Sequence, residues 1–241
     1  MANFQKHIEI STIGSGIAST VLFGAGLINY IEVMTLWIAG AFGGILPDID
    51  SDNSTTIKII FFVISGISIC IGLSQLPLST STLEIWLFII VCYAIINFIV
   101  SPLFKSLTVH RGVFHSLLGG VFFGLLSVVS AYQLTGLNNF MSWLMGFFIF
   151  LGYLIHLTLD EVYSVDFMNA RIKRSFGTAL KLFSYNNVKT SSLMLIVTVA
   201  LCFLTPSINS FNHSAETKQV YYKIKDSFLP LALSKGPLFT P

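Results

Sequence analysis

The sequence predicts an all-α fold, a polytopic transmembrane bundle of about six or seven helical spans. The first observation is composition: mean hydropathy is +0.80, 54% of the 241 residues are hydrophobic and only 10% are charged, well outside the averages of soluble proteins. The second is patterning, since uncharged runs such as 59–83 and 112–159 are long enough to cross a bilayer. The run 112–159 is long enough for two helices, with a turn at 136–139.

The expected spans follow these runs in order. The first begins after Lys6 and has no convincing cleavage site, so we expect it to be retained. The second is short and contains Gly40, Gly43 and Gly44, so it is either tilted, packed within the bundle or re-entrant. We predict spans at 10–29, 33–47, 58–76, 83–104, 113–134, 140–161 and 191–207.

The chain divides into three parts. We expect residues 1–165 to form the main transmembrane bundle, 166–190 a basic connector, and 191–241 the last span and a tail. Small residues in the first and fifth spans, such as Gly14 and Gly120, predict that these two spans pack together.

Charge sets the expected orientation. The connector 163–190 has an excess of basic residues, which places it in the cytoplasm by the positive-inside rule. Each span crosses the membrane once, so counting the spans backwards from the connector puts Lys105, Lys58 and the amino terminus with Lys6 on the same side. The amino terminus is therefore expected to face the cytoplasm.

The connector has a possible second role. Its apolar and basic residues fall on opposite faces of a helix, the layout of a helix lying on anionic lipid headgroups. A plain positive-inside loop explains the charges equally well. The apolar face has Met168, Ile172, Phe176 and Phe183, and the basic face has Arg171, Arg174 and Lys181.

Histidines and acids are rare and clustered. The chain has 11 Asp and Glu and 5 His, and nearly all of the histidines and about half of the acids gather in four places. These are His7, 46–52, 110–115 and 156–161, all expected at the cytoplasmic face. Imidazole and carboxylate together are ligands for divalent metal ions, so the clustering predicts a metal site.

His156 and Asp160 are spaced i and i+4, which projects both from one helical face about one turn apart. The alternative is a buried histidine beside an acid, but ionisable groups in membrane helices are costly and usually functional. His110 and His115 flank the start of the fifth span, with Arg111 between them. An interfacial basic cap is the alternative there.

Asp48 and Asp50 follow Pro47, and oxygen ligands two residues apart can meet a cation from an extended stretch. An ordinary helix cap is the alternative. His7 alone would more often be a surface histidine, and its value comes from lying on the same predicted face. Cys70 and the other two cysteines are separate and lie in apolar spans, so neither a disulfide framework nor a thiolate site is indicated.

Three motifs in order resemble the YdjM-like family of inner-membrane metal-dependent hydrolases, over roughly residues 1–165. They are Gly-Gly-Ile-Leu-Pro-Asp-Ile-Asp at 43–50, His-Arg-Gly-Val-Phe-His-Ser at 110–116 and Gly-Tyr-Leu-Ile-His-Leu-Thr-Leu-Asp at 152–160. The resemblance implies a bacterial inner-membrane protein with a cytoplasm-facing metal centre and hydrolytic activity. The implied ligands are His7, Asp48, Asp50, His110, His115, His156 and Asp160. More distantly, the pattern is similar to zinc-dependent phospholipase C and P1-type nucleases, which suggests phosphodiester chemistry.

For such a hydrolase, zinc is the first choice of metal, with manganese or iron as alternatives. Arg111 is placed to neutralise charge on a phosphate-like transition state, and Glu161 is a possible base unless it simply faces solvent. The expected substrate is a lipid or phosphate ester at the cytoplasmic leaflet, with membrane lipids as partners. A net charge of only +2 disfavours nucleic acid.

Two other functions fit the same residues. A cation or proton transporter would use intramembrane acids and histidines, although these residues cluster at one face rather than along a path. A non-catalytic scaffold would use a structural metal site to hold helix ends together.

Overall fold

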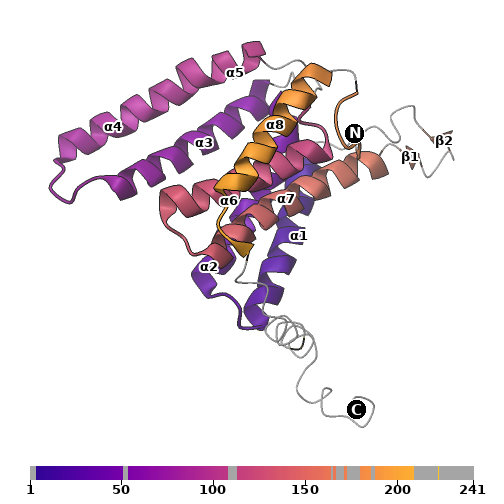
Figure 1. Cartoon of the computed structure of the whole chain (residues 1–241), viewed down its shortest axis with the longest axis horizontal. Coiled ribbons are helices and arrows are strands. Elements are labelled where there is room, and N and C mark those ends of the chain that lie inside the picture. The colour runs from indigo at the N-terminus through magenta and orange to yellow at the C-terminus, as the bar shows by residue number, and fades with distance from the viewer. Residues whose placement is uncertain are drawn as a thin grey trace, which may run out of the picture.

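The chain folds into long helices in the order that its hydropathy predicts, which confirms the all-α class (Figure 1). The computed structural model describes residues 4–50, 54–107, 113–163, 165–166, 171–172, 180–185, 188–208 and 222. The helices in these ranges are α1 (Phe4–Gly24), α2 (Tyr30–Gly43), η1 (Leu46–Asp50), α3 (Ser54–Gln75), α4 (Thr82–Ala94), η2 (Ile95–Val100), α5 (Ser101–Leu107), α6 (Leu117–Thr135), α7 (Asn139–Val162) and α8 (Val188–Leu204). The segments α4, η2 and α5 follow one another without a break, so seven long helical segments correspond to the seven predicted spans.

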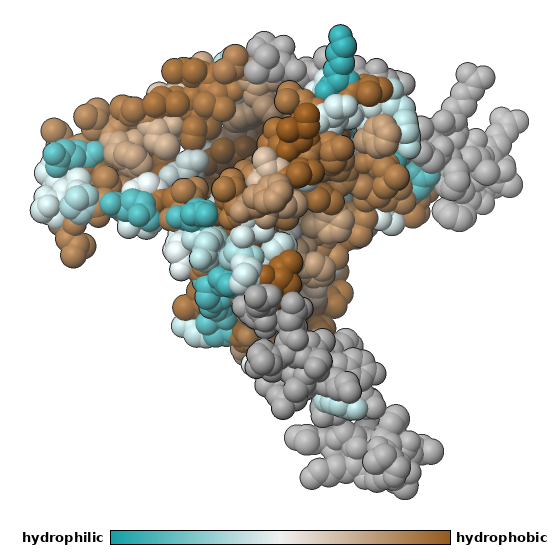
Figure 2. Space-filling model, viewed as in Figure 1, coloured by the Kyte–Doolittle hydropathy of each residue, from teal (hydrophilic) through white to brown (hydrophobic). Residues whose placement is uncertain are grey.

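Among the residues that the structure describes, four helices are long and apolar enough to cross a membrane. They cover Ile57–Gln75, Thr82–Phe104, Leu117–Thr135 and Asn139–Val162, while α2 and α8 are apolar but shorter. Hydrophobic side chains cover the lateral surfaces of the helices, and hydrophilic residues gather near the helix ends (Figure 2). This distribution is that of a protein whose helices are solvated by lipid.

Local signals fix several helix ends. Asn29 and Glu32 form a capping box at the start of α2, as Ser81 and Glu84 do for α4. At the predicted turn, Gly136 takes a left-handed conformation with φ 68° that ends α6, and the side chain of the next cap, Asn138, begins α7.

Two predicted boundaries are wrong near the amino terminus. Helix α1 begins at Phe4 rather than at residue 10, so His7 lies within the helix and not before it. The stretch after α2 is a 3₁₀ helix, η1, and not extended, because Pro47 lacks the amide hydrogen that an α-helix would need but tolerates a tight turn.

One face of helix α2 packs against α1 and α7, and the opposite face, with Ile31, Met34 and Ile38, is exposed. Small residues make this close approach possible. A Cβ atom on Gly43 would clash with the carbonyl of Ile149, and one on Gly152 would clash with the carbonyl of Gly40. Leu36 of α2 and Phe148 of α7 are completely buried at this contact.

The sequence predicts that the first and fifth spans pack against each other. In the structure these spans are α1 and α6, and each of them packs against α7 instead. Gly14 of α1 faces Ile155 of α7, whereas Gly120 of α6 faces Tyr153 and Phe150 of α7. Helix α7 is therefore the central helix, and half of its membrane-spanning window is buried within the protein (50%), more than in any other candidate span.

Helices α3 and α4 form a hairpin that extends away from α1 and α2 (Figure 1). The amide of Asn97, in the π-helical segment η2, donates hydrogen bonds to Ser65 Oγ (2.7 Å) and to the Tyr93 carbonyl (3.0 Å). At the turn end of the hairpin, the amide of Gln75 donates to the Leu134 carbonyl of α6 (3.0 Å). These bonds join the hairpin internally and to α6.

The helix considered for the connector is absent from its described residues. Val165–Asp166 and Arg171–Ile172 form a short antiparallel pair of strands, β1 and β2, and 180–185 is irregular. The reason for the irregular part is a contact with α6: Leu117 and Leu118 donate their backbone N–H groups to carbonyls of that segment (2.9 and 3.0 Å). The rest of the connector, with Met168, Arg174 and Phe176, lies outside the described ranges.

The packing of α2 on α7 predicts that Gly152→Ala lowers the free energy of unfolding by about 1–3 kcal/mol, because the added methyl group overpacks the contact. Thermal unfolding of the detergent-purified protein measures it. Gly66→Ala is the matched control, since no atom lies within 4 Å of that Cβ position on α3. Equal melting temperatures for the two variants would contradict this account of the packing.

Candidate metal centre

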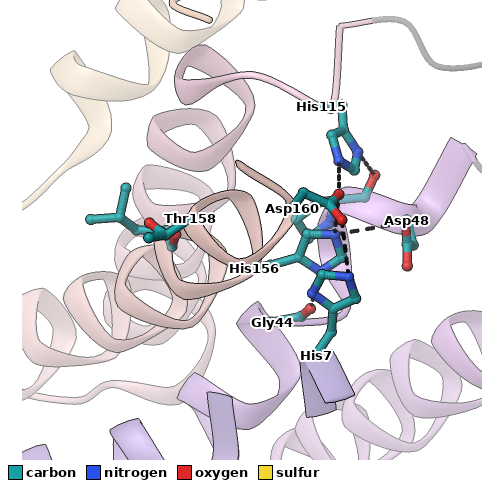
Figure 3. A network of polar contacts seen from close by, with 9 residues as sticks. His7, Gly44, Asp48, His115, His156, Thr158 and Asp160 are labelled. Atoms are coloured by element: carbon teal, nitrogen blue, oxygen red, sulfur yellow. Dashed lines mark hydrogen bonds and ion pairs between the residues drawn. The ribbon is translucent and has the colours of Figure 1, made fainter. Parts of the chain in front are cut away.

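Five of the predicted ligands converge at one end of the bundle (Figure 3). His7 comes from α1, Asp48 from η1, His115 from the segment before α6, and His156 and Asp160 from α7. Segments far apart in the sequence thus bring three imidazoles and two carboxylates together.

The two ligands on α7 are at the centre of the cluster. His156 and Asp160 lie one turn apart on the buried face, and they are 0% and 4% exposed. His156 Nε2 lies 3.7 Å from Asp160 Oδ2. The i, i+4 spacing therefore places both side chains as the sequence predicts.

His7 reaches the cluster from the first turn of α1. Its Nε2 lies 3.3 Å from Asp160 Oδ1, and its ring stacks on that of His156 with the centroids 3.6 Å apart and the planes 13° apart. The helix turns that follow explain how α1 comes so close: Ser11, Ser15 and Ser19 continue the His7 face at i+4 spacing and are completely buried. Their small side chains allow α1 to pack tightly on α2.

The end of α2 supplies backbone acceptors. The Nδ1–H of His156 donates to the carbonyl of Gly44 (2.7 Å), and the Nδ1–H of His115 donates to the carbonyl of Pro47 (3.3 Å). Asp48 follows directly, with Oδ1 3.8 Å from His156 Nε2. Its side chain is 23% exposed, whereas the Asp160 side chain is 3% exposed, so Asp48 marks the open side of the cluster.

His115 is held by the cap of α6. The hydroxyl of Ser116 donates to the Val113 carbonyl (2.5 Å) and accepts the backbone N–H of Gly119 (3.3 Å). The segment 180–185 contacts the same helix end, because its carbonyls accept the two backbone hydrogen bonds from Leu117 and Leu118. In this position His115 Nε2 lies 2.8 Å from Asp160 Oδ2.

The hydrogen bonds to carbonyls determine which ring nitrogens face the cluster as acceptors. A carbonyl only accepts, so Nδ1 of His115 and of His156 must bear the hydrogen, and in the neutral rings Nε2 offers a lone pair toward Asp160. Two acceptors facing each other repel unless a proton or a cation lies between them. Metal-binding histidines are oriented in this way, by donating from the other ring nitrogen.

The donor set fits a divalent metal ion. His156 Nε2 is buried without a hydrogen-bond partner among the described residues, and an unsatisfied buried polar group costs about 1–3 kcal/mol. Two groups of three side chains have ligand atoms within 4.8 Å of one another: His7, His156 and Asp160, and Asp48, His115 and His156. Mixed imidazole and carboxylate ligands suit zinc, manganese or iron.

The other predicted site residues are not placed in this cluster. The side chain of Asp50 lies outside what the structure describes, as do His110 and Arg111 altogether. Glu161 follows Asp160 on α7 and is partly exposed, and its role stays a prediction.

Sequence reasoning missed two contributions to the site. The roles of the Gly44 and Pro47 carbonyls could not be predicted from residue type, because every residue has a backbone carbonyl. The serine face that continues His7 was visible as Ser11, Ser15 and Ser19 at i+4 spacing, a signal of close helix packing.

Comparison with known proteins agrees with the resemblance of the motifs. The family model described as YdjM inner membrane protein matches residues 11–209, most of the chain. The chain belongs to the YdjM family. His7 lies just outside the matched range, and the other four members of the cluster lie within it. Searches of curated proteins and of solved structures find no match. The more distant likeness to phospholipase C and P1-type nucleases therefore stays a prediction.

The site geometry predicts that Gly44 orients His156. The backbone of Gly44 (φ −69°, ψ −10°) suits any residue, but an added Cβ would collide with the side chain of Ser11. Gly44→Ala should therefore shift the carbonyl that accepts from His156 and weaken zinc binding about 10–100-fold, as loss of an orienting partner does. Zinc titration of the purified YdjM-family protein measures the Kd.

A second substitution provides the control. Ser11→Gly removes the colliding atoms, so it should restore most of the affinity when combined with Gly44→Ala and leave it unchanged alone. Wild-type affinity in Gly44→Ala, or no recovery in the double variant, would contradict the orienting role of Gly44.

Proposed function

We propose that this membrane protein of the YdjM family is a divalent-metal-dependent hydrolase, with its metal centre at the His/Asp cluster. The observation that supports the proposal most is the set of three imidazole Nε2 atoms around one buried carboxylate, two of them oriented by backbone carbonyls. We propose His7, Asp48, His115, His156 and Asp160 as ligands, with zinc as the first choice of metal.

A bound divalent ion would lower the pKa of a coordinated water and polarise the bond to be hydrolysed. The residues of the chain contribute orientation and exclusion of water. Asp160 and His156 are almost completely buried, which strengthens electrostatic interactions within the site. Asp48 is the most exposed of the five, so we propose that a substrate approaches from its side.

The surroundings of the cluster favour a lipid-like substrate. A row of aromatic rings leads from α3 to α6 beside His115: the centroids of Phe61 and Phe104 are 5.6 Å apart, those of Phe104 and Phe114 5.5 Å, and those of Phe114 and Phe123 5.7 Å. Phe61 is buried and the other three rings pack against the buried residues Ile49 and Ile60, so the cluster borders on apolar protein, which agrees with a substrate that has an apolar part. We propose a phosphate ester or similar lipid as substrate, with Arg111 neutralising its charge and Glu161 as a base.

The proposed orientation places the centre at the cytoplasmic face. Lys6, Lys58 and Lys189 lie at helix ends near the cluster, whereas the described residues at the opposite helix ends include no Lys or Arg. This asymmetry agrees with the positive-inside rule.

Loss of metal should abolish activity in this account. His156→Ala and Asp160→Ala should each remove the bound metal and lower hydrolysis of short-chain phospholipids or aryl phosphate esters at least about 100-fold. Elemental analysis measures the metal, and chromatographic analysis of the hydrolysis products measures the activity, both on detergent-purified protein. Thr158→Ala is the matched control, since Thr158 is exposed on α7 between the two ligands and points away from the cluster (Figure 3).

The outcomes separate the possible functions. Metal bound without hydrolysis of any ester would favour a structural centre, because structural sites have a closed coordination shell. Stoichiometric metal retained in both His156→Ala and Asp160→Ala would show that these residues are not ligands and would overturn the proposal.

A further inference from the structure

We infer that the centre holds two divalent ions and not one, with the carboxylate of Asp160 as the bridge between them. The inference rests on the proposed metal-dependent function and specifies how its ligands are divided. It comes from three features of the cluster: the stacking of two rings, the division of the Asp160 oxygens, and the overlap of the two ligand groups.

The stacked rings of His7 and His156 cannot both bind one ion in good geometry. An imidazole nitrogen binds metal in the plane of its ring, at about 2 Å. The two ring planes are inclined by 13° with the centroids 3.6 Å apart, so they intersect roughly 15 Å away, far beyond the length of such a bond. Two ions side by side, one in each plane, satisfy both nitrogens without moving the rings.

The spacing of the rings agrees with this arrangement. Both Nε2 atoms face the same carboxylate, so the two nitrogens lie on one side of the stack. Ions in two-metal hydrolytic sites lie about 3.5–4 Å apart. The centroid separation of 3.6 Å falls within that range.

Asp160 presents its two oxygens to different histidines. Oδ1 lies 3.3 Å from His7 Nε2, while Oδ2 lies 2.8 Å from His115 Nε2 and 3.7 Å from His156 Nε2. A carboxylate that presents one oxygen to each ligand set is suited to bridge two ions. Separations of this size are also close to those between neighbouring ligand atoms around an ion with bonds of about 2 Å.

The ring stacking decides how the two overlapping ligand groups are divided. The two groups share His156, but a ring nitrogen has a single lone pair and binds a single ion. We assign His156, His115, Asp48 and Asp160 Oδ2 to one ion, and His7 with Asp160 Oδ1 to the other. The second ion has fewer protein ligands from the described residues, which leaves positions for water and for a substrate oxygen.

This division bears on the class of substrate. Two divalent ions have four positive charges, and among the described residues the carboxylates of Asp48 and Asp160 supply two negative charges to balance them. The remaining positive charge favours an anionic group such as a phosphate ester, whose oxygens two ions can bind together.

Metal content and electron paramagnetic resonance of the manganese-loaded full chain test the inference. We expect two equivalents in the wild-type protein and the exchange-coupled spectrum of two bridged manganese ions. His7→Ala should keep one equivalent and show an uncoupled spectrum, because the four-ligand set is intact. Lys6→Ala, at an exposed neighbouring position on α1, is the control and should keep two coupled ions.

A single equivalent in the wild-type protein, or two equivalents without coupling, would overturn the two-ion assignment even if hydrolysis were observed. Loss of all metal from a His7→Ala variant that elutes as folded protein would also overturn it, since His7 would then belong to the only ion. The measurement on the wild-type protein does not depend on whether any variant folds. Absence of any bound metal would instead contradict the proposed function itself.

Discussion

The structure depends on one buried carboxylate, Asp160, contacted by imidazoles from three separate segments of the chain. An isolated carboxylate buried this deeply would be strongly unfavourable, and breaking a buried charged pair typically costs about 3–5 kcal/mol. His7, His115 and His156 approach it from α1, from the loop before α6 and from α7. The ends of these helices are therefore held together by the same atoms that would bind a metal, which links the fold to the function.

Close packing of helices makes that convergence possible. Small residues let α1 and α7 approach α2, and the end of α2 then lies where the carbonyls of Gly44 and Pro47 orient two of the histidines. In a membrane, where lipid weakens the hydrophobic drive between helices, such backbone-to-backbone contact is a main source of association. The small size of Ser11 and Gly44 thus matters to the site because it lets the two helices approach closely.

The sequence was sufficient for the fold class, the order of the helices and five members of the cluster, because apolar runs and rare charged residues are strong signals in a membrane protein. The sequence was less informative where tertiary contacts determine the position or conformation of a segment. The short span of α2 could not be placed from its length, and the segment 180–185 is irregular because its carbonyls bind the end of α6. The ring stacking of His7 on His156 depends on helix packing and has no counterpart in the residue pattern.

X-ray absorption spectroscopy of the zinc-loaded, detergent-purified protein tests the central claim most directly, because it reports the atoms around the metal without any assumption about substrate. The ligands proposed from the cluster predict a shell of nitrogen and oxygen at about 2.0–2.1 Å with the multiple scattering of imidazole. A shell of oxygen alone, or one with sulfur from the cysteines, would contradict the assignment of the metal to His7, His115 and His156.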